Sequence, residues 1–146
     1  MVKPEAIAAA QAAQKKWGVP ASVSLAQYAI ESDWGTKEPP GSNNGLGIQA
    51  LPGLPSVASV SFEYRAGKRI DLVEHFAKFV SVEQCFDKHG ELLATNRAYR
   101  YAMAQKDNPR QFAHCLQGVY ETAPGYDTIL IRIMDSNDLY QYDVAA

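Results

Sequence analysis

A stretch rich in proline and glycine, residues 36–56, constrains the fold more than any other part of the sequence. It contains the run EPPGSNNGLGIQALPGLP. Neither a helix nor a central strand tolerates this composition, because proline lacks a backbone N–H and glycine weakens regular structure. Loops of this length are uncommon in a small domain unless they have a function. The sequence therefore predicts a long, functional loop.

Helical patterns precede this loop. Residues 4–17 begin with a proline and are followed by Gly18, a combination typical of a helix start and a helix stop. Residues 21–34 repeat apolar side chains at helical spacing until Gly35. The sequence therefore predicts two helices, and the second ends directly at the loop.

After the loop the pattern alternates and then becomes helical again. Residues 60–76 alternate around a turn at 65–68, which predicts a β-hairpin. Ser81 and Gln84 form a capping box that begins a helix. Further helices are predicted over 96–105, from Asn108–Pro109 onward and over 126–139. The predicted fold class is mainly α (α+β), with a small hairpin lobe.

The composition limits the class of protein. The chain has 146 residues, of which 47% are hydrophobic, and this predicts one domain over residues 1–146. Its net charge of -2 gives no cationic field for non-specific nucleic-acid binding. No run approaches the roughly 20 apolar residues of a membrane span, and the start does not resemble a signal peptide. We expect no nucleic-acid partner and no membrane insertion.

Cysteines and histidines give little support for other chemistry. Cys85 and Cys115 are either two buried thiols or one disulfide, and both fall on apolar helical stripes, which disfavours a cysteine nucleophile. The three histidines lie on separate elements without the spacing of metal ligands. We therefore expect neither a metal nor a cofactor.

Glu31 is the first candidate for chemistry. On a helix it lies one turn from Gln27 and Tyr28 and one turn from Trp34, so aromatic carbon replaces part of its water. Desolvation and a helix C-terminus both raise the pKa of a carboxyl, which makes it a usable general acid near neutral pH. The alternative is an ordinary exposed glutamate at a helix end.

Residues suited to sugar binding follow Glu31. Side-chain amides bind hydroxyl and N-acetyl groups, and aromatic rings offer faces to sugars, although most tyrosines in a domain simply pack. The predicted substrate-binding residues are Trp34, Asn43, Asn44, Gln49, Tyr99 and Tyr126.

A second carboxylate is usual in glycoside hydrolysis. If Phe62 and Tyr64 pack inward, Glu63 points away from the core, toward solvent or a groove. We therefore prefer Glu63 to Glu74, which shares a face with apolar residues.

These motifs resemble the glucosaminidase family of peptidoglycan hydrolases, glycoside hydrolase family 73, which includes the flagellar rod assembly muralytic domain and many autolysins. The runs LAQYAIESDWG and NNGLGIQ are similar to the family's "ES-x-WG" helix end and "NN-x-FGI-K" loop. The later runs FEY, FAKFVS, NRAY and YETAPGY are similar to its "EY-x-x-G", "F-R-x-Y-x-S", "NPRY" and "YATDPxY". The resemblance extends over about residues 7–139.

The resemblance implies a lysozyme-like α fold with a groove beside a small β lobe, and hydrolysis of the β-1,4 bond following N-acetylglucosamine. Glu31 would be the general acid, Glu63 the second carboxylate, and Tyr120 or Tyr126 the tyrosine that orients substrate or water. The chain departs from the motifs at three positions: Ala123 replaces an aspartate, Gln49 a lysine and Arg97 a proline. Gln49 also resembles the loop of lytic transglycosylases, which use one glutamate.

The expected partner is therefore the peptidoglycan glycan strand, bound by a monomer that is made in the cytoplasm and reaches the wall through a holin or a secretion system. A phage-type endolysin is preferred to a secreted effector, which would also have an immunity protein as a partner. The alternatives are a lytic transglycosylase, a muramidase, or a catalytically silent wall-binding module.

Overall fold

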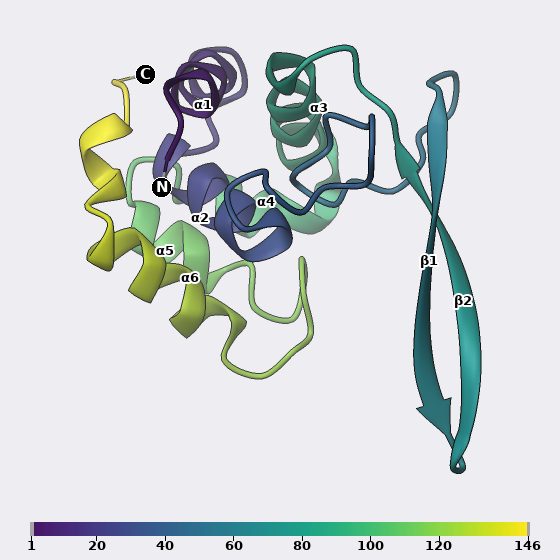
Figure 1. Cartoon of the computed structure of the whole chain (residues 1–146). Helices are drawn as coiled ribbons and strands as arrows, with labels where there is room; N and C mark the ends of the chain where they lie inside the picture. The colour runs from purple at the N-terminus through teal and green to yellow at the C-terminus, as the bar shows by residue number, and fades with distance from the viewer. Residues whose placement is uncertain (1, 146) are drawn as a thin grey trace.

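The fold consists of short helices around α2 and one long hairpin (Figure 1), in a computed structural model that describes residues 2–145 except the side chain of Glu63. The helices are α1 (Pro4–Trp17), α2 (Ala21–Ser32), α3 (Val82–Thr95), α4 (Arg100–Met103), α5 (Pro109–His114) and α6 (Tyr126–Ser136). The 3-10 helices are η1 (Arg97–Tyr99) and η2 (Leu139–Tyr142), and the strands are β1 (Ser56–Arg65) and β2 (Lys68–Ala77).

The core forms around α2. Nine of its residues are buried, because α1, α5, α6 and η2 all pack against it. Helix α1 presents four buried alanines, whose small side chains allow close packing against α2 and α3. This arrangement encloses α2 along most of its length and leaves only its C-terminal end near the surface (Figure 1).

Local capping signals set several of the helix bounds. The first helix begins and ends where the sequence predicts, with Gly18 at φ 91°. The capping prediction for α3 is confirmed, since Ser81 Oγ accepts the N–H of Gln84 at 3.1 Å. The helix predicted over 126–139 ends at Ser136, because Asp138 adopts a left-handed conformation with φ 48°. The helix predicted over 96–105 is a 3-10 turn followed by the short α4.

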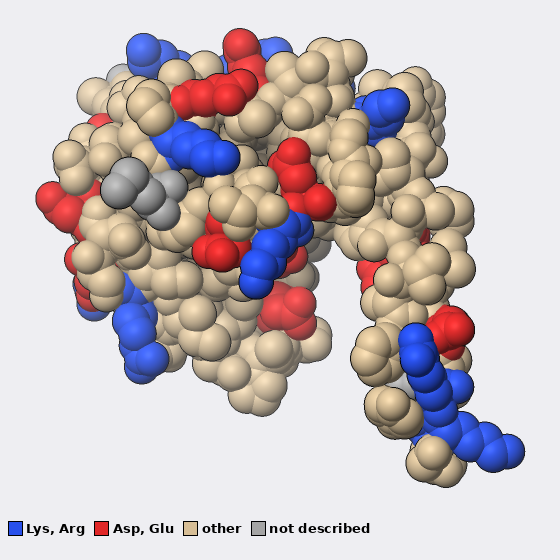
Figure 2. Space-filling view, viewed as in Figure 1, with Lys and Arg blue, Asp and Glu red and all other residues tan. Residues whose placement is uncertain are grey.

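The predicted hairpin is confirmed. Its antiparallel pairing extends from Ser56–Ala77 to Arg65–Lys68. The connection is a two-residue turn, Ala66–Gly67, with φ of 51° and 76°, which is typical of a type I′ turn. A single β-bridge between Gln49 and Phe76 joins the long loop to the base of β2 and adds a minimal third strand. The hairpin stands apart from the helices (Figure 2).

The orientation predicted for two hairpin aromatics is wrong. Phe62 and Tyr64 were expected to pack inward, but they are 56% and 67% exposed. Their strand extends beyond the helices, so this face of the hairpin has no core to pack against. Leu72 and Phe76 of β2 lie on the opposite face, whereas Val73 shares the face of Phe62 and is 58% exposed.

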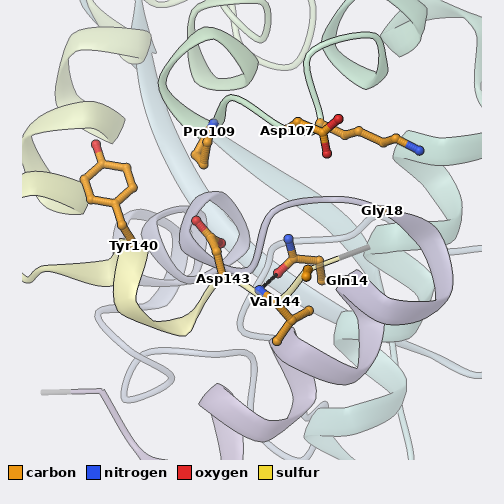
Figure 3. A pocket seen from close by; sticks show the side chains of 9 residues that line it. Gln14, Gly18, Asp107, Pro109, Tyr140, Asp143 and Val144 are labelled. Carbon is orange, nitrogen blue, oxygen red and sulfur yellow. Dashed lines mark hydrogen bonds between the residues drawn. The ribbon is translucent and has the colours of Figure 1, made fainter.

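The segment at residues 143–144 packs against α1 and the start of α2. Gln14 Oε1 accepts the backbone N–H groups of Ala21 at 3.1 Å and Val144 at 2.9 Å. Asp143 accepts two hydrogen bonds from Ser22. These contacts border a hollow of about 380 Å³ (Figure 3), near the N-terminal end of α2, where Ser22 donates to Asp143. Within residues 2–145, no helix combines the length and apolarity of a membrane span.

Candidate active site

Glu31 lies at the junction of two hollows. It occupies the last turn of α2 and borders a groove of about 650 Å³ and a smaller hollow of about 280 Å³. Gly47 and Phe76 also border both, so the two hollows form one cleft with Glu31 in its wall. The groove is lined by Glu31, Leu46, Gly47, Ile48, Gln49, Ala50, Leu51, Glu74, Phe76, Leu92, Tyr99, Tyr120 and Glu121.

The surroundings of Glu31 favour its protonated form. Glu31 is exposed to the cleft, but partial desolvation of its carboxyl raises its pKa, and the nearby charge of Glu121 raises this pKa further. The loop approaches closely at Gly47, where φ is 65° and a Cβ atom would lie 2.9 Å from Glu31 Oε2. Only a residue without a side chain allows the carboxyl to rest against the loop here. Glu31 therefore has the environment of a general acid.

Asn44 holds the loop in place. Its side-chain amide donates to the carbonyl oxygens of Ile48 at 2.8 Å and Ala77 at 2.9 Å, and its Oδ1 accepts the N–H of Ile48 at 3.1 Å. The residue is 1% exposed. The amide predicted to bind substrate is therefore occupied within the protein, and Asn44 ties the loop to the end of β2.

Two other predicted binding residues also have structural contacts. Asn43 donates its amide to the carbonyl oxygen of Phe79 at 3.0 Å. Trp34 is half-buried against the core, with a left-handed φ of 60°. As far as the described residues show, neither side chain borders the two hollows. The structure brings Gln49 and Tyr99, in contrast, into the groove with Glu31.

Stacked tyrosines form one wall of the groove. Tyr120 lines the groove, and its ring lies parallel to that of Tyr126, with centroids 6.2 Å apart and an interplanar angle of 9°. Tyr99 contacts Tyr120 from another side at 6.0 Å. Tyr126 is only 4% exposed and lies behind Tyr120. Burial raises the pKa of all three hydroxyls, so they remain neutral and able to donate a hydrogen bond.

Two further carboxylates line the groove. Glu74, the less favoured candidate in the sequence, borders it together with Glu31. Glu121 was missed, and its Oε1 is fixed by the backbone N–H groups of Thr122 at 2.9 Å and Ala123 at 3.1 Å. A signal was present, because the motif aspartate is replaced by Ala123 while an acidic residue stands two positions earlier.

Glu63 lies farther along the hairpin. Its backbone pairs with Ile70, on the hairpin face that also carries Ser59 and Glu74. It is four residues beyond Ser59, which borders the smaller hollow, and this corresponds to about 13 Å along the strand. Its side chain lies outside the described part of the chain. In the backbone register, Glu63 therefore shares a face with Glu74 and lies farther out along the hairpin.

The two cysteines do not form a disulfide, and His89 is buried. Cys85 and Cys115 are both free, so the disulfide alternative is wrong. Burial lowers the pKa of His89 to about 4, which keeps its imidazole neutral. Among the described residues there is no cluster of three or more His, Cys, Asp or Glu suited to a metal ion.

Comparisons with known proteins identify related sequences and folds. The Glucosaminidase family, described as mannosyl-glycoprotein endo-beta-N-acetylglucosaminidase, matches residues 7–139. An autolysin of Enterococcus faecalis is 33% identical, over 84% of this chain and 18% of that protein. The catalytic domain of the autolysin Auto from Listeria monocytogenes has a TM-score of 0.79 at 28% identity, over 94% of this chain and 82% of that one. A peptidoglycan hydrolase mutant from Sphingomonas sp. A1 has a TM-score of 0.77 at 31% identity, over 94% of each chain.

A glutamate at the end of a central helix, bordering a groove beside a hairpin, is an arrangement suited to acid catalysis of glycoside hydrolysis. The chain belongs to the glucosaminidase family, glycoside hydrolase family 73, and is related to the hydrolase domains of autolysins. It spans half or less of the length of the first curated relatives, between 18% and 50%.

Proposed function

We propose that this domain hydrolyses the β-1,4 glycosidic bond that follows N-acetylglucosamine in peptidoglycan. The observation that carries the proposal is the position of Glu31, a carboxyl with a raised pKa in the wall of an open cleft. Membership of the glucosaminidase family supports the choice of bond. The names of the related autolysin and peptidoglycan hydrolase support the choice of polymer.

The cleft fits cleavage within a glycan strand. The groove and the smaller hollow meet at Glu31, so sugar units can lie on both sides of the bond that it protonates. Glu31 gives its proton to the glycosidic oxygen, which leaves with the departing sugar as a hydroxyl. The anomeric carbon then takes a water oxygen, either directly or after attack by a second carboxylate.

Glu63 is the proposed second carboxylate, and Glu74 is its competitor within the groove. Glu63 has the motif position on the hairpin, whereas Glu74 already borders the groove beside Glu31. We assign the neutral hydroxyl of Tyr120 to the orientation of substrate or water. Gln49 and Tyr99 are assigned to the sugar rings along the same wall.

Substitution by glutamine tests these roles. Glu31→Gln keeps the shape of the side chain but removes the proton, and we expect hydrolysis of purified walls to fall by about 10³-fold. Glu63→Gln and Glu74→Gln, measured in parallel, identify the second carboxylate as the one whose loss lowers kcat. Wild-type lysis by Glu31→Gln would refute the proposal.

Product analysis tests the bond and the reaction. A reducing N-acetylglucosamine end identifies a glucosaminidase, and a reducing muramic acid end identifies a muramidase. An anhydro-muramic end identifies a lytic transglycosylase, the outcome that Gln49 in the groove favours. Wall binding without release of either reducing ends or anhydro ends would identify a silent binding module. The role as a phage-type endolysin or a secreted effector stays a prediction, tested by lysis of host cells with and without a holin.

A further inference from the structure

A chain of buried polar groups lies beneath the groove. His89 Nε2 lies 2.8 Å from Gln27 Oε1, and Gln27 Nε2 donates to the hydroxyl of Tyr126 at 3.0 Å. The three residues come from α3, α2 and α6. His89 and Gln27 are fully buried, and Tyr126 is 4% exposed. The chain therefore connects three helices through side chains that do not reach solvent.

The direction of these hydrogen bonds follows from their partners. The carbonyl oxygen of Gln27 can only accept, so His89 Nε2 carries the hydrogen of the neutral imidazole. The amide nitrogen of Gln27 can only donate, so the hydroxyl oxygen of Tyr126 accepts and its own hydrogen points elsewhere. His89 Nδ1 is then an acceptor, and it has no hydrogen-bond partner among the described residues.

This arrangement lowers the stability that the core could otherwise have. Buried polar groups gain little net stability from hydrogen bonds, and an unpaired buried acceptor costs about 1–3 kcal/mol. Apolar side chains of similar volume at positions 27 and 89 would avoid that cost. The benefit of the chain is therefore better explained by the placement of its members than by stability.

The members of the chain surround Tyr120. The Tyr126 ring stacks on the Tyr120 ring, and the imidazole of His89 meets that ring at 6.1 Å and 64°. Gln27 lies on α2 one helical turn before Glu31. The same helix therefore carries both the acid and the residue that joins His89 to Tyr126. The groove-lining tyrosine and the acid are thereby held by one set of contacts.

We propose that Gln27 and His89 are positioning residues for hydrolysis, which hold Tyr126, and through it the ring of Tyr120, in fixed relation to Glu31. This inference rests on the proposed function. Neither residue borders the groove in the described part of the chain, so both act through the tyrosines.

Kinetics on soluble glycan strands test the inference. Gln27→Met keeps the volume without the hydrogen bonds, and Tyr126→Phe keeps the ring without the hydroxyl. We expect kcat to fall about 10-fold in both, with KM changed less than about two-fold, because displaced groups weaken the transition state more than binding. His89→Gln restores a donor near the Nε2 position and should recover kcat relative to His89→Leu.

Ser22→Ala is the matched control. It removes a buried hydrogen bond from the same helix, on the side of Asp143. We expect it to lower Tm with kcat unchanged. If Gln27→Met and Tyr126→Phe fold and keep wild-type kcat, or if Ser22→Ala lowers kcat equally at the same loss of Tm, the inference is overturned.

Nuclear magnetic resonance of the His89 ring nitrogens gives a readout independent of hydrolysis. We expect a neutral imidazole protonated at Nε2 in the wild type, and a changed Nε2 shift in Gln27→Met. If the wild type has the expected Nε2 protonation of His89 but does not cleave peptidoglycan, only the proposed function is refuted. If the wild type is active but its His89 is protonated at Nδ1, only the proposed hydrogen bonds from His89 through Gln27 to Tyr126 are refuted.

Discussion

The helical body and the hairpin place polar and apolar side chains in opposite ways. The body buries Gln27, Asn44 and His89 completely or nearly so, whereas the hairpin exposes Phe62 and Tyr64. This difference arises from the number of layers of secondary structure packed in each region. Several helices enclose α2, whereas a two-stranded ribbon has no second layer to cover its faces. Burial in this molecule therefore depends on position in the fold more than on residue type.

The two regions should also respond differently to substitution. In the body, removing one buried amide leaves several partners unsatisfied, and the cost is large. On the hairpin, an exposed ring has few neighbours to lose. The predictions below test this contrast from the largest expected effect to the smallest.

Asn44→Ala should be the most damaging change. It leaves two carbonyl oxygens and one N–H without their side-chain partner, and we expect a loss of about 4 kcal/mol in the free energy of unfolding. Urea unfolding measures this loss. Asn43→Ala removes one hydrogen bond and should cost about 1 kcal/mol. Equal costs for the two asparagines would contradict the central role of Asn44 in the loop.

Acid should weaken the body through His89. Its pKa is about 4 in the folded chain and 6.5 when unfolded, so the unfolded chain binds more protons in this range. The stability contribution of the neutral imidazole is complete above pH 6.5 and decreases by up to about 3 kcal/mol as the pH falls to 4. Chemical unfolding at several pH values measures this decrease. His89→Leu should flatten the pH dependence, and an unchanged slope would contradict the assignment.

Glu121→Gln should move the pH profile of hydrolysis. Removing a negative charge lowers the pKa of Glu31, so the protonated acid is lost at lower pH and the alkaline limb of kcat/KM shifts downward. A pH series on soluble glycan strands measures the shift. Glu83→Gln, in the first turn of α3 and outside the lining of both hollows, is the control. An identical profile for wild type and Glu121→Gln would show that the two carboxyls do not interact.

Phe62→Ala should have the smallest effect. The ring is 56% exposed and contacts mainly Tyr64 and the guanidinium of Arg69, so we expect a change within about 0.5 kcal/mol. The same substitution at Phe86, which is fully buried, should cost about 3–5 kcal/mol. Thermal unfolding of the pair measures the contrast. Similar costs would mean that the hairpin face is covered in solution.

Local rules predicted much of the fold. The bounds of α1, the cap at Ser81 and the hairpin turn each depend on a few neighbouring residues, and the structure confirms all three. Glu31 was proposed as the acid because of its place at a helix end, the amide-rich loop that follows and the resemblance of both to family motifs. These features need no knowledge of distant contacts.

Features that depend on distant contacts were not predicted. The partners of Asn44 include Ala77, and the exposure of Phe62 depends on where the helices end. Glu121 enters the groove only because its loop folds back beside Tyr120 and Glu31. Spacing along one helix or strand cannot show which other element covers a side chain.

The register of the hairpin makes its length an engineering variable. Side chains alternate between faces, so deleting two successive pairs, Ser61–Leu72 and Phe62–Asp71, would shorten the arm by about 7 Å and keep every remaining residue on its face. Deleting a single pair would reverse the faces of all residues beyond it. Because the strands pair mainly with each other, arms of graded length can be built on one unchanged helical body.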